Sequence, residues 1–200
     1  MGPEQQKTPK GMEGEAAIFA RRSLRDLCLA IDWLVLDVDG VLTDGGIIYS
    51  DAGAEFKQFH VRDGSGLKIW EHLGKHSAII TGRNSPIIQR RATEIGVEVV
   101  FQGALDKMPA YRQLLNDRAL KPEQVCFIGD DVPDLPILRN CGLAVAVADA
   151  CPDVIAAADF VTRTAGGRGA AREVLEMILR CQGLWGKLHD RYRDANLADP

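Results

Sequence analysis

Two groups of aspartates are the residues of this sequence best suited to chemistry. The first group is Asp37 and Asp39, and the second is Asp130, Asp131 and Asp134. Carboxylates this close together repel unless a metal ion, a shared proton or solvent compensates their charge. If the fold brings both groups together, their oxygens predict a hard cation, Mg²⁺. The competing interpretation is that these acids only cap helices and shape turns.

The elements that must position these acids alternate between strand and helix. Apolar runs typical of buried strands are expected at 33–38, 78–81, 97–101, 125–129 and 143–147, with a short edge strand at 160–161. Helices are expected at about 18–29, 85–96, 106–120 and 169–181. This alternation predicts an α/β fold, a Rossmann-like parallel sheet with helices on both faces.

Such sheets bind ligands at the carboxyl ends of their strands. Asp37 and Asp39 end the first strand, Thr81 the second, and Asp130 and Asp131 the strand at 125–129, so we expect them to meet in one crevice. The segment 47–61 breaks the alternation, because two strand-like stretches flank a turn at Ser50–Gly53. It predicts a β-hairpin flap beside that crevice.

The composition indicates which kind of protein this chain can be. The chain has 200 residues, 46% hydrophobic residues and a formal net charge of −4, which suits one globular domain without a basic footprint for nucleic acid. Five scattered cysteines indicate free thiols in a reducing compartment. Without a membrane-length apolar run or a signal-peptide core, we expect a cytoplasmic protein. The predicted organisation is a flexible extension at 1–22, one domain at 23–182 and a tail at 183–200.

Four motifs in order give a specific resemblance. They are Asp-Val-Asp-Gly-Val-Leu-Thr-Asp at 37–44, Thr81 within Ile-Ile-Thr-Gly-Arg, Lys107, and Gly-Asp-Asp-Val-Pro-Asp at 129–134. This set resembles the haloacid dehalogenase superfamily. Within it, segments over about 33–182 resemble the capless 3-deoxy-D-manno-octulosonate 8-phosphate phosphatases. The stretches between Asp44, Thr81 and Lys107 are too short to hold a cap domain.

The resemblance implies a reaction and a role for each motif. Asp37 would attack phosphorus and form an aspartyl-phosphate, and Asp39 would act as general acid and then general base. Thr81 and Lys107 would hold the phosphoryl oxygens.

The resemblance also implies a Mg²⁺ site. The ligands would be the Asp37 carboxylate, the Asp39 backbone carbonyl and Asp130. Asp131 and Asp134 would position the metal-bound water and the lysine of the third motif.

The implied substrate is a small sugar acid carrying a phosphate at one end and a carboxylate at the other. The residues implied to bind it are His60, Val61, Arg62, Asp63, Gly64, Lys68, Gly82, Arg83, Arg91 and Lys107. Lys68 stands where the family often has arginine. The family forms homotetramers in which hairpins pack together and a neighbouring subunit completes each site. From the residues alone, the apolar hairpin side chains could instead belong to the intrachain core, His60 could be a packed residue and Arg91 a solvated charge.

The implied function is hydrolysis of 3-deoxy-D-manno-octulosonate 8-phosphate, a step towards bacterial lipopolysaccharide. One alternative keeps the mechanism with a nonulosonate 9-phosphate as substrate. Another is a non-catalytic oligomerisation module, because similar domains fused to sialic-acid cytidylyltransferases can lose catalytic residues. The presence of the complete motif set, and of no transferase domain before it, favours the enzyme. The glycine-rich segment 166–169 is expected to be a flexible loop before the last helix, not a phosphate-binding P-loop.

Overall fold

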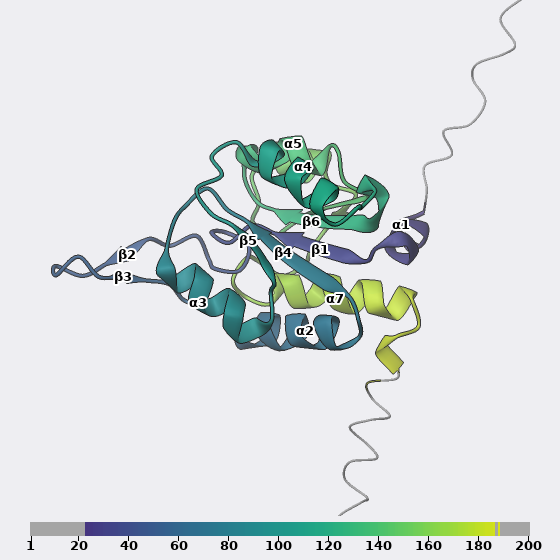
Figure 1. Ribbon diagram of the computed structural model, residues 1–200, viewed down its shortest axis with the longest axis horizontal. Helices are drawn as coiled ribbons and strands as arrows, with labels where there is room; N and C mark the ends of the chain where they lie inside the picture. Colours follow the sequence, from purple (N-terminus) through teal and green to yellow (C-terminus); the bar gives the residue numbers. More distant parts are fainter. Residues whose placement is uncertain (1–22, 187, 189–200) are drawn as a thin grey trace, which may run out of the picture.

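The computed structural model describes residues 23–186 and 188, which form one six-stranded sheet with helices on both faces (Figure 1). The strands lie in the order β5-β4-β1-β6-β7-β8, and every neighbouring pair is parallel. Their bounds are β1 Trp33–Leu36, β4 His76–Ile80, β5 Val99–Phe101, β6 Val125–Gly129, β7 Leu143–Ala146 and β8 Phe160–Val161. The predicted α/β class is confirmed.

The helices divide between the two faces. In Figure 1, α2 (Val61–His72), α3 (Pro86–Ile95) and α7 (Ala170–Cys181) cover the lower face, and α4 (Lys107–Asp117) and α5 (Leu135–Leu138) cover the upper one. The short helix α6 (Pro152–Ala157) packs against α5, and α1 (Leu24–Ala30) packs against α7. Residues 18–22 of the first expected helix lie outside the described residues, as does most of the predicted tail.

Local signals explain where two of these helices begin and end. Ser85 caps α3 by accepting a hydrogen bond from the Ile87 N–H, and Gly96 ends it in the left-handed region at φ 83°. Asp106 caps α4 by accepting a hydrogen bond from the Met108 N–H at 3.1 Å. This cap places Lys107 at the first residue of α4, next to the sheet edge.

The two central strands, β1 and β6, carry the core. All their side chains are buried, and Leu34, Leu36 and Phe127 are completely inaccessible. Burying each such side chain contributes roughly 1.5–3 kcal/mol. The strands at whose ends the aspartates stand are therefore fully buried in the sheet.

The predicted hairpin is present but shorter than expected. β2 (Ile48–Tyr49) pairs antiparallel with β3 (Glu55–Phe56), and the hairpin projects from the carboxyl end of the sheet (Figure 1). Helix α2 begins at Val61, so the strand expected to reach that residue ends earlier, because His60 already serves as the helix N-cap. Between residues 44 and 107, all of which are described, no cap domain is inserted.

The glycine-rich segment Gly166–Gly169 is packed, which corrects the expectation of a flexible loop. The Gly166 N–H donates to Asp149 Oδ1 at 2.8 Å, and the Gly167 N–H donates to the Val41 carbonyl at 2.9 Å. A Cβ added at Gly166 would collide with the Gly40 carbonyl oxygen. Glycine is required because two backbones touch here, and the segment supports the loop that follows Asp37.

Candidate active site

Sheet register brings the two aspartate groups together. β1 and β6 are hydrogen-bonded neighbours, with Leu36 opposite Ile128, so the residues after each strand emerge side by side. Carboxylate oxygens of Asp37, Asp130 and Asp134 all lie within 4.8 Å of one another. The predicted convergence at the carboxyl edge therefore holds for these three acids.

Two features of the backbone fix this cluster. Asp134 lies in a 3₁₀ turn, Val132–Asp134, and its Oδ2 accepts hydrogen bonds from the Asp130 N–H at 3.0 Å and the Asp131 N–H at 3.4 Å. Gly40 has φ 94°, and a Cβ there would collide with the Asp130 carboxylate. A glycine at position 40 is thus needed both for the turn and for the approach of Asp130.

Lys107 supplies one positive charge inside the cluster. Its Nζ lies 3.1 Å from Asp37 Oδ1 and 2.6 Å from Asp134 Oδ1, and its side chain is only 4% exposed. Burial alone would lower the pKa of Lys107, but the neighbouring Asp37 and Asp134 carboxylates raise it above its ordinary value. The lysine is therefore an ammonium ion at neutral pH.

One ammonium does not neutralise three carboxylates. Burial, opposed by Lys107 and reinforced by Asp134, raises the pKa of Asp37 to about 6. Burial and then the charges of Asp37 and Asp134 raise the pKa of Asp130 to about 8. Asp130 Oδ1 is also buried without a hydrogen-bond partner among the described residues.

This arrangement fits a bound Mg²⁺. The donors are oxygens, they carry excess negative charge, and one of them lacks a partner, as a hard divalent cation requires. Asp37 and Asp130 would hold the ion, because the Asp134 oxygens already accept hydrogen bonds from Lys107 and from the Asp130 and Asp131 N–H groups. Asp134, expected only to position other groups, both contacts Lys107 and belongs to this cluster. The Asp39 carboxylate lies outside it, and the expected contribution of Asp39 to the metal is its backbone carbonyl.

The Asp39 carboxylate is held by the hairpin. Lys57 forms an ion pair with Asp39 Oδ1 and lies 3.6 Å from Glu55 Oε1, while Arg83 Nε lies 3.9 Å from Asp39 Oδ2. Sequence reasoning missed Lys57. The signal for it is the alternation of the strand, which puts Glu55 and Lys57 on the same face, opposite Phe56.

A pocket of about 270 Å³ lies at the carboxyl edge of the sheet. All four residues predicted to be catalytic, Asp37, Asp39, Thr81 and Lys107, line this pocket. The complete lining is Asp37, Asp39, Thr81, Gly82, Arg83, Ala104, Leu105, Lys107, Asp130, Asp131, Pro133 and Asp134. This volume is slightly below the usual range for small-molecule sites, about 300–1,000 Å³. The pocket suits a phosphoryl group better than a whole sugar acid.

Seven predicted substrate-binding residues do not line this pocket, namely His60, Val61, Arg62, Asp63, Gly64, Lys68 and Arg91. Asp63 is buried, which raises its pKa, and its Oδ1 accepts a hydrogen bond from the Arg172 N–H of α7 at 2.8 Å. Arg91 stacks over Phe59 at 5.5 Å and lies 3.4 Å from Glu94 Oε2. Within one chain Asp63 ties α2 to α7 and Arg91 of α3 contacts Phe59, which lies just before α2, and none of the seven residues lines the phosphoryl pocket.

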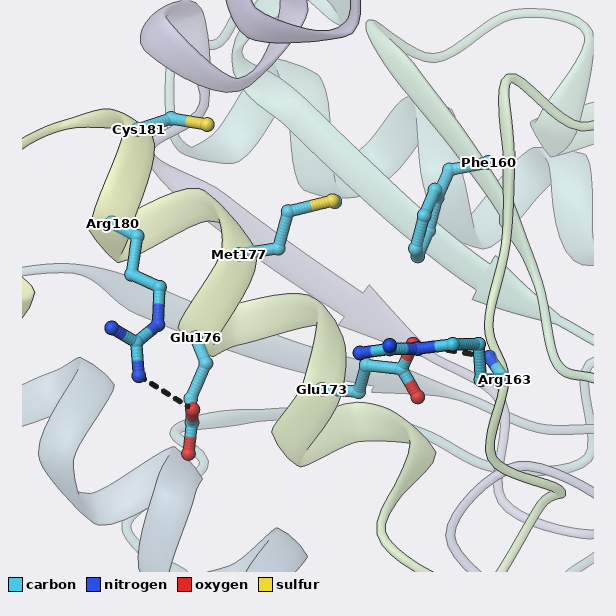
Figure 2. Close-up of a pocket in the computed structure, with 7 residues that line it drawn as sticks. All are labelled: Phe160, Arg163, Glu173, Glu176, Met177, Arg180 and Cys181. Carbon is cyan, nitrogen blue, oxygen red and sulfur yellow. Dashed lines mark hydrogen bonds and ion pairs between the residues drawn. The ribbon is translucent and has the colours of Figure 1, made fainter.

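A larger cavity, of about 440 Å³, lies elsewhere, against α7 and β8 (Figure 2). Its lining residues are Phe160, Arg163, Glu173, Glu176, Met177, Arg180 and Cys181. Both of its arginines already have carboxylate partners, Arg163 with Glu173 and Arg180 with Glu176, each at 3.4 Å. This cavity therefore offers no unpaired charge to a ligand and is not a candidate active site.

Comparison with known proteins places the chain in a family. A family model described as haloacid dehalogenase-like hydrolase matches residues 89–174. The 3-deoxy-D-manno-octulosonate 8-phosphate phosphatase of Escherichia coli K12 is 47% identical over 150 residues, which cover 75% of this chain and 80% of that enzyme. The chain belongs to this phosphatase family. The resemblance inferred from the four motifs is confirmed.

Solved structures of family members share the fold. The phosphatase from Yersinia pestis superimposes with a TM-score of 0.80 at 43% identity, covering 81% of this chain and 88% of that one. The phosphatase from Moraxella catarrhalis, solved with magnesium, phosphate and KDO, gives a TM-score of 0.82 at 38% identity and covers 84% and 97% of the two chains. Within residues 23–186, no helix is long and apolar enough to span a bilayer.

Proposed function

We propose that this phosphatase hydrolyses 3-deoxy-D-manno-octulosonate 8-phosphate to the free sugar acid and inorganic phosphate, with Mg²⁺ as cofactor. The observation that carries the proposal is the convergence of Asp37, Asp130, Asp134 and Lys107 at the ends of two adjacent strands. Family membership at 47% identity supplies the substrate.

The side chains of this site can perform both halves of a phosphomonoester hydrolysis. Asp37 attacks phosphorus, the bond to the sugar oxygen breaks, and an aspartyl-phosphate forms while Asp39 gives a proton to the departing oxygen. A water molecule then gives a proton to Asp39 and attacks phosphorus, so the Asp37–phosphorus bond breaks and phosphate is released. Thr81 and Lys107 donate to the phosphoryl oxygens throughout. Bound Mg²⁺ would offset the repulsion between the nucleophile and the phosphoryl group.

The substrate's carboxylate end would contact residues beyond the phosphoryl pocket. We assign this role to His60, Val61, Arg62, Asp63, Gly64, Lys68 and Arg91 as a group, with Gly82 and Arg83 at the pocket rim. Their position outside the pocket of one chain supports a site completed between copies. Arginine suits a carboxylate because its planar fork can donate two hydrogen bonds.

The assembly that would bring copies together is a homotetramer with hairpins packed against one another. Ile48, Tyr49 and Phe56 are 51%, 60% and 53% exposed, an apolar surface at the projecting end of the chain. Such a surface favours association. The intrachain alternative fits Phe59, which packs against the core, but not these three side chains, which do not enter it.

The proposed location is the cytoplasm, and the proposed pathway is lipopolysaccharide precursor synthesis. All five cysteines are free thiols, as a reducing compartment would leave them. Because the net charge is −4, an anionic substrate must bind where cations gather locally, as at Lys107 and Arg83. The same net charge does not support a nucleic-acid partner.

The direct test measures phosphate release from a panel of phosphorylated keto sugar acids with eight and nine carbons, with Mg²⁺ and after exhaustive chelation. We expect the highest kcat/KM with 3-deoxy-D-manno-octulosonate 8-phosphate and loss of turnover on chelation. A higher kcat/KM for a nonulosonate 9-phosphate would change the substrate. No release from any member would make the chain a non-catalytic module.

A further inference from the structure

One buried lysine at the end of the hairpin, Lys57, contacts a carboxylate of the active site. The Lys57 side chain is 2% exposed and forms an ion pair with Asp39 Oδ1. We propose that Lys57 is a positioning residue that holds the Asp39 carboxylate in place for proton transfer. This inference rests on the proposed function, because Asp39 is its general acid and base.

Lys57 is itself held from the other side. Glu55 lies two residues before Lys57, on the same face of the extended segment, and its Oε1 is 3.6 Å from the Lys57 ammonium. The Ser85 hydroxyl donates to Glu55 Oε2 at 2.6 Å, and the Ser85 N–H donates to Gln102 Oε1 at 2.7 Å. Arg83 Nη2 also lies 3.6 Å from Glu55 Oε1. The base of the hairpin is therefore tied to the segment that follows β4, and the lysine has little freedom to move.

The ion pair distinguishes the two oxygens of Asp39. Oδ1 is occupied by Lys57, whereas Oδ2 has no hydrogen-bond partner among the described residues. Arg83 Nε lies 3.9 Å from Oδ2 and likewise lacks a hydrogen bond among the described residues. Oδ2 is also buried, so the ion pair at Oδ1 and the burial of Oδ2 together fix the orientation of the Asp39 carboxylate.

Lys57 acts through Asp39 and not on the substrate. Its buried side chain neither lines the phosphoryl pocket nor reaches solvent. Without the ion pair, the Asp39 side chain could rotate about two torsions, and misplacement by about 1 Å can cost on the order of 100-fold in rate. Lys57 also connects two functions, because the hairpin that would form the subunit contact fixes the group that transfers the proton.

The test compares Lys57→Met with Lys57→Arg and with a matched control, Lys75→Met. Lys75 forms a similar ion pair, 2.7 Å from Asp32, at the opposite edge of the sheet. On the sugar acid phosphate, whose leaving oxygen needs a proton, we expect Lys57→Met to lower kcat by about 10- to 100-fold with KM within about 3-fold. Lys57→Arg, which keeps a cation, should recover at least half of that loss on a logarithmic scale, and Lys75→Met should leave kcat unchanged.

A second substrate and a double variant separate positioning from a purely structural role. With p-nitrophenyl phosphate, whose leaving group departs without a proton, Lys57→Met should lower the rate of phosphoryl transfer to Asp37, measured as the p-nitrophenol burst, by less than about 3-fold. On the sugar acid phosphate, adding Lys57→Met to Asp39→Asn should cause no further loss, because the lysine acts through Asp39. Equal losses on both substrates, or additive losses in the double variant, would overturn the proposal.

The proposal can still be tested if the Lys57→Met variant does not fold. If Lys57→Met fails to fold, Lys57→Arg carries the test, because a displaced Asp39 predicts a kcat loss confined to the sugar acid phosphate. Loss on both substrates in that folded variant would count against the proposal. Failure of the proposed function has a different signature, since the wild-type chain would then turn over p-nitrophenyl phosphate and no sugar acid phosphate.

Discussion

The carboxyl edge of the sheet and the β2–β3 hairpin are built on opposite principles. At the edge, Asp37, Asp134 and Lys107 are buried, and the lysine contacts both acids. On the hairpin, Ile48 and Phe56 are exposed, while Lys57 contacts Asp39 and Tyr49 accepts a hydrogen bond from Arg83. A single chain therefore brings the predicted catalytic residues Asp37, Asp39, Thr81 and Lys107 into one pocket, while the hairpin keeps an exposed apolar surface. We expect the carboxyl edge to set the reaction and the surface beside the hairpin to set the choice of substrate, with Lys57 as the connection between them.

The largest loss of activity is expected from a substitution at the carboxyl edge of the sheet. Asp37→Asn removes the nucleophile, so phosphate release from any substrate should fall by at least about 1,000-fold. Thermal unfolding should show no loss of stability, because the substitution removes a buried negative charge. Asp153→Asn, an exposed acid at the start of α6, is the control and should keep full turnover. Turnover by folded Asp37→Asn would remove the assigned nucleophile.

The next effect tests whether the edge depends on its backbone support. Gly166→Ala should displace the loop after Asp37, because the new Cβ would meet the Gly40 carbonyl. We expect kcat/KM to fall by about 10- to 100-fold and the free energy of unfolding to fall by about 1–3 kcal/mol, measured by steady-state kinetics and denaturant titration. Gly186→Ala is the matched control, since nothing lies within 4 Å of its Cβ position. Equal behaviour of the two variants would show that the loop tolerates displacement.

The hairpin should respond differently. Ile48→Ser with Phe56→Ser removes exposed apolar surface, so we expect the mass from light scattering to fall below that of a tetramer. The kcat/KM for the sugar acid phosphate should fall by about 10-fold, while p-nitrophenyl phosphate turnover should stay within about 3-fold. Leu29→Ser, an exposed apolar residue on α1, should change neither quantity. A wild-type mass equal to one chain would end the argument for sites shared between copies.

The smallest effect concerns the stability of the edge itself. In the metal-free protein the pKa of Asp37 is raised to about 6 and that of Asp130 to about 8, from an ordinary 3.8. Between about pH 4 and pH 8 the native state thus binds more protons than the unfolded state, so the free energy of unfolding should fall as pH rises. Mg²⁺ competes with those protons and should stabilise the protein more at pH 8 than at pH 5.5.

Denaturant midpoints at the two pH values, with chelator and with Mg²⁺, check this expectation. At 100 times its dissociation constant, a ligand that binds only the native state adds about 2.7 kcal/mol. Asp130→Asn should flatten the pH dependence of the metal-free protein and reduce the gain from Mg²⁺. A gain from Mg²⁺ that is the same at both pH values would place the ion away from these carboxylates.

Much of the site at the carboxyl edge of the sheet could be predicted, because the sequence patterns that indicate it are local. Apolar runs ending in Asp37 and Asp130 predict strands with acids at their ends, and parallel strand ends share one edge. Ser85-Pro86 and Gly96 likewise mark the limits of α3. These features depend on nearby residues and on general rules of sheet topology, so one sequence suffices.

The contacts of the hairpin could not be predicted in the same way. The pairing of Lys57 with Asp39 depends on how a flap folds back over the edge, and it has no local signature beyond strand alternation. The packing of Gly166 on Gly40 joins segments far apart in the chain. Residues such as Arg91 lie outside the pocket of their own chain, and their proposed role depends on where a second copy sits.

The register between β1 and β6 also bears on which ion the enzyme accepts. Asp37 and Asp130 follow strands locked together by consecutive backbone hydrogen bonds, so the distance between their carboxylates is set by strand spacing and not by a flexible loop. Mg²⁺ requires oxygens at about 2.0–2.1 Å, whereas Ca²⁺ prefers about 2.3–2.6 Å and more ligands. Widening the site for the larger ion would strain two fully buried strands. We therefore expect turnover with Mg²⁺ to exceed turnover with Ca²⁺.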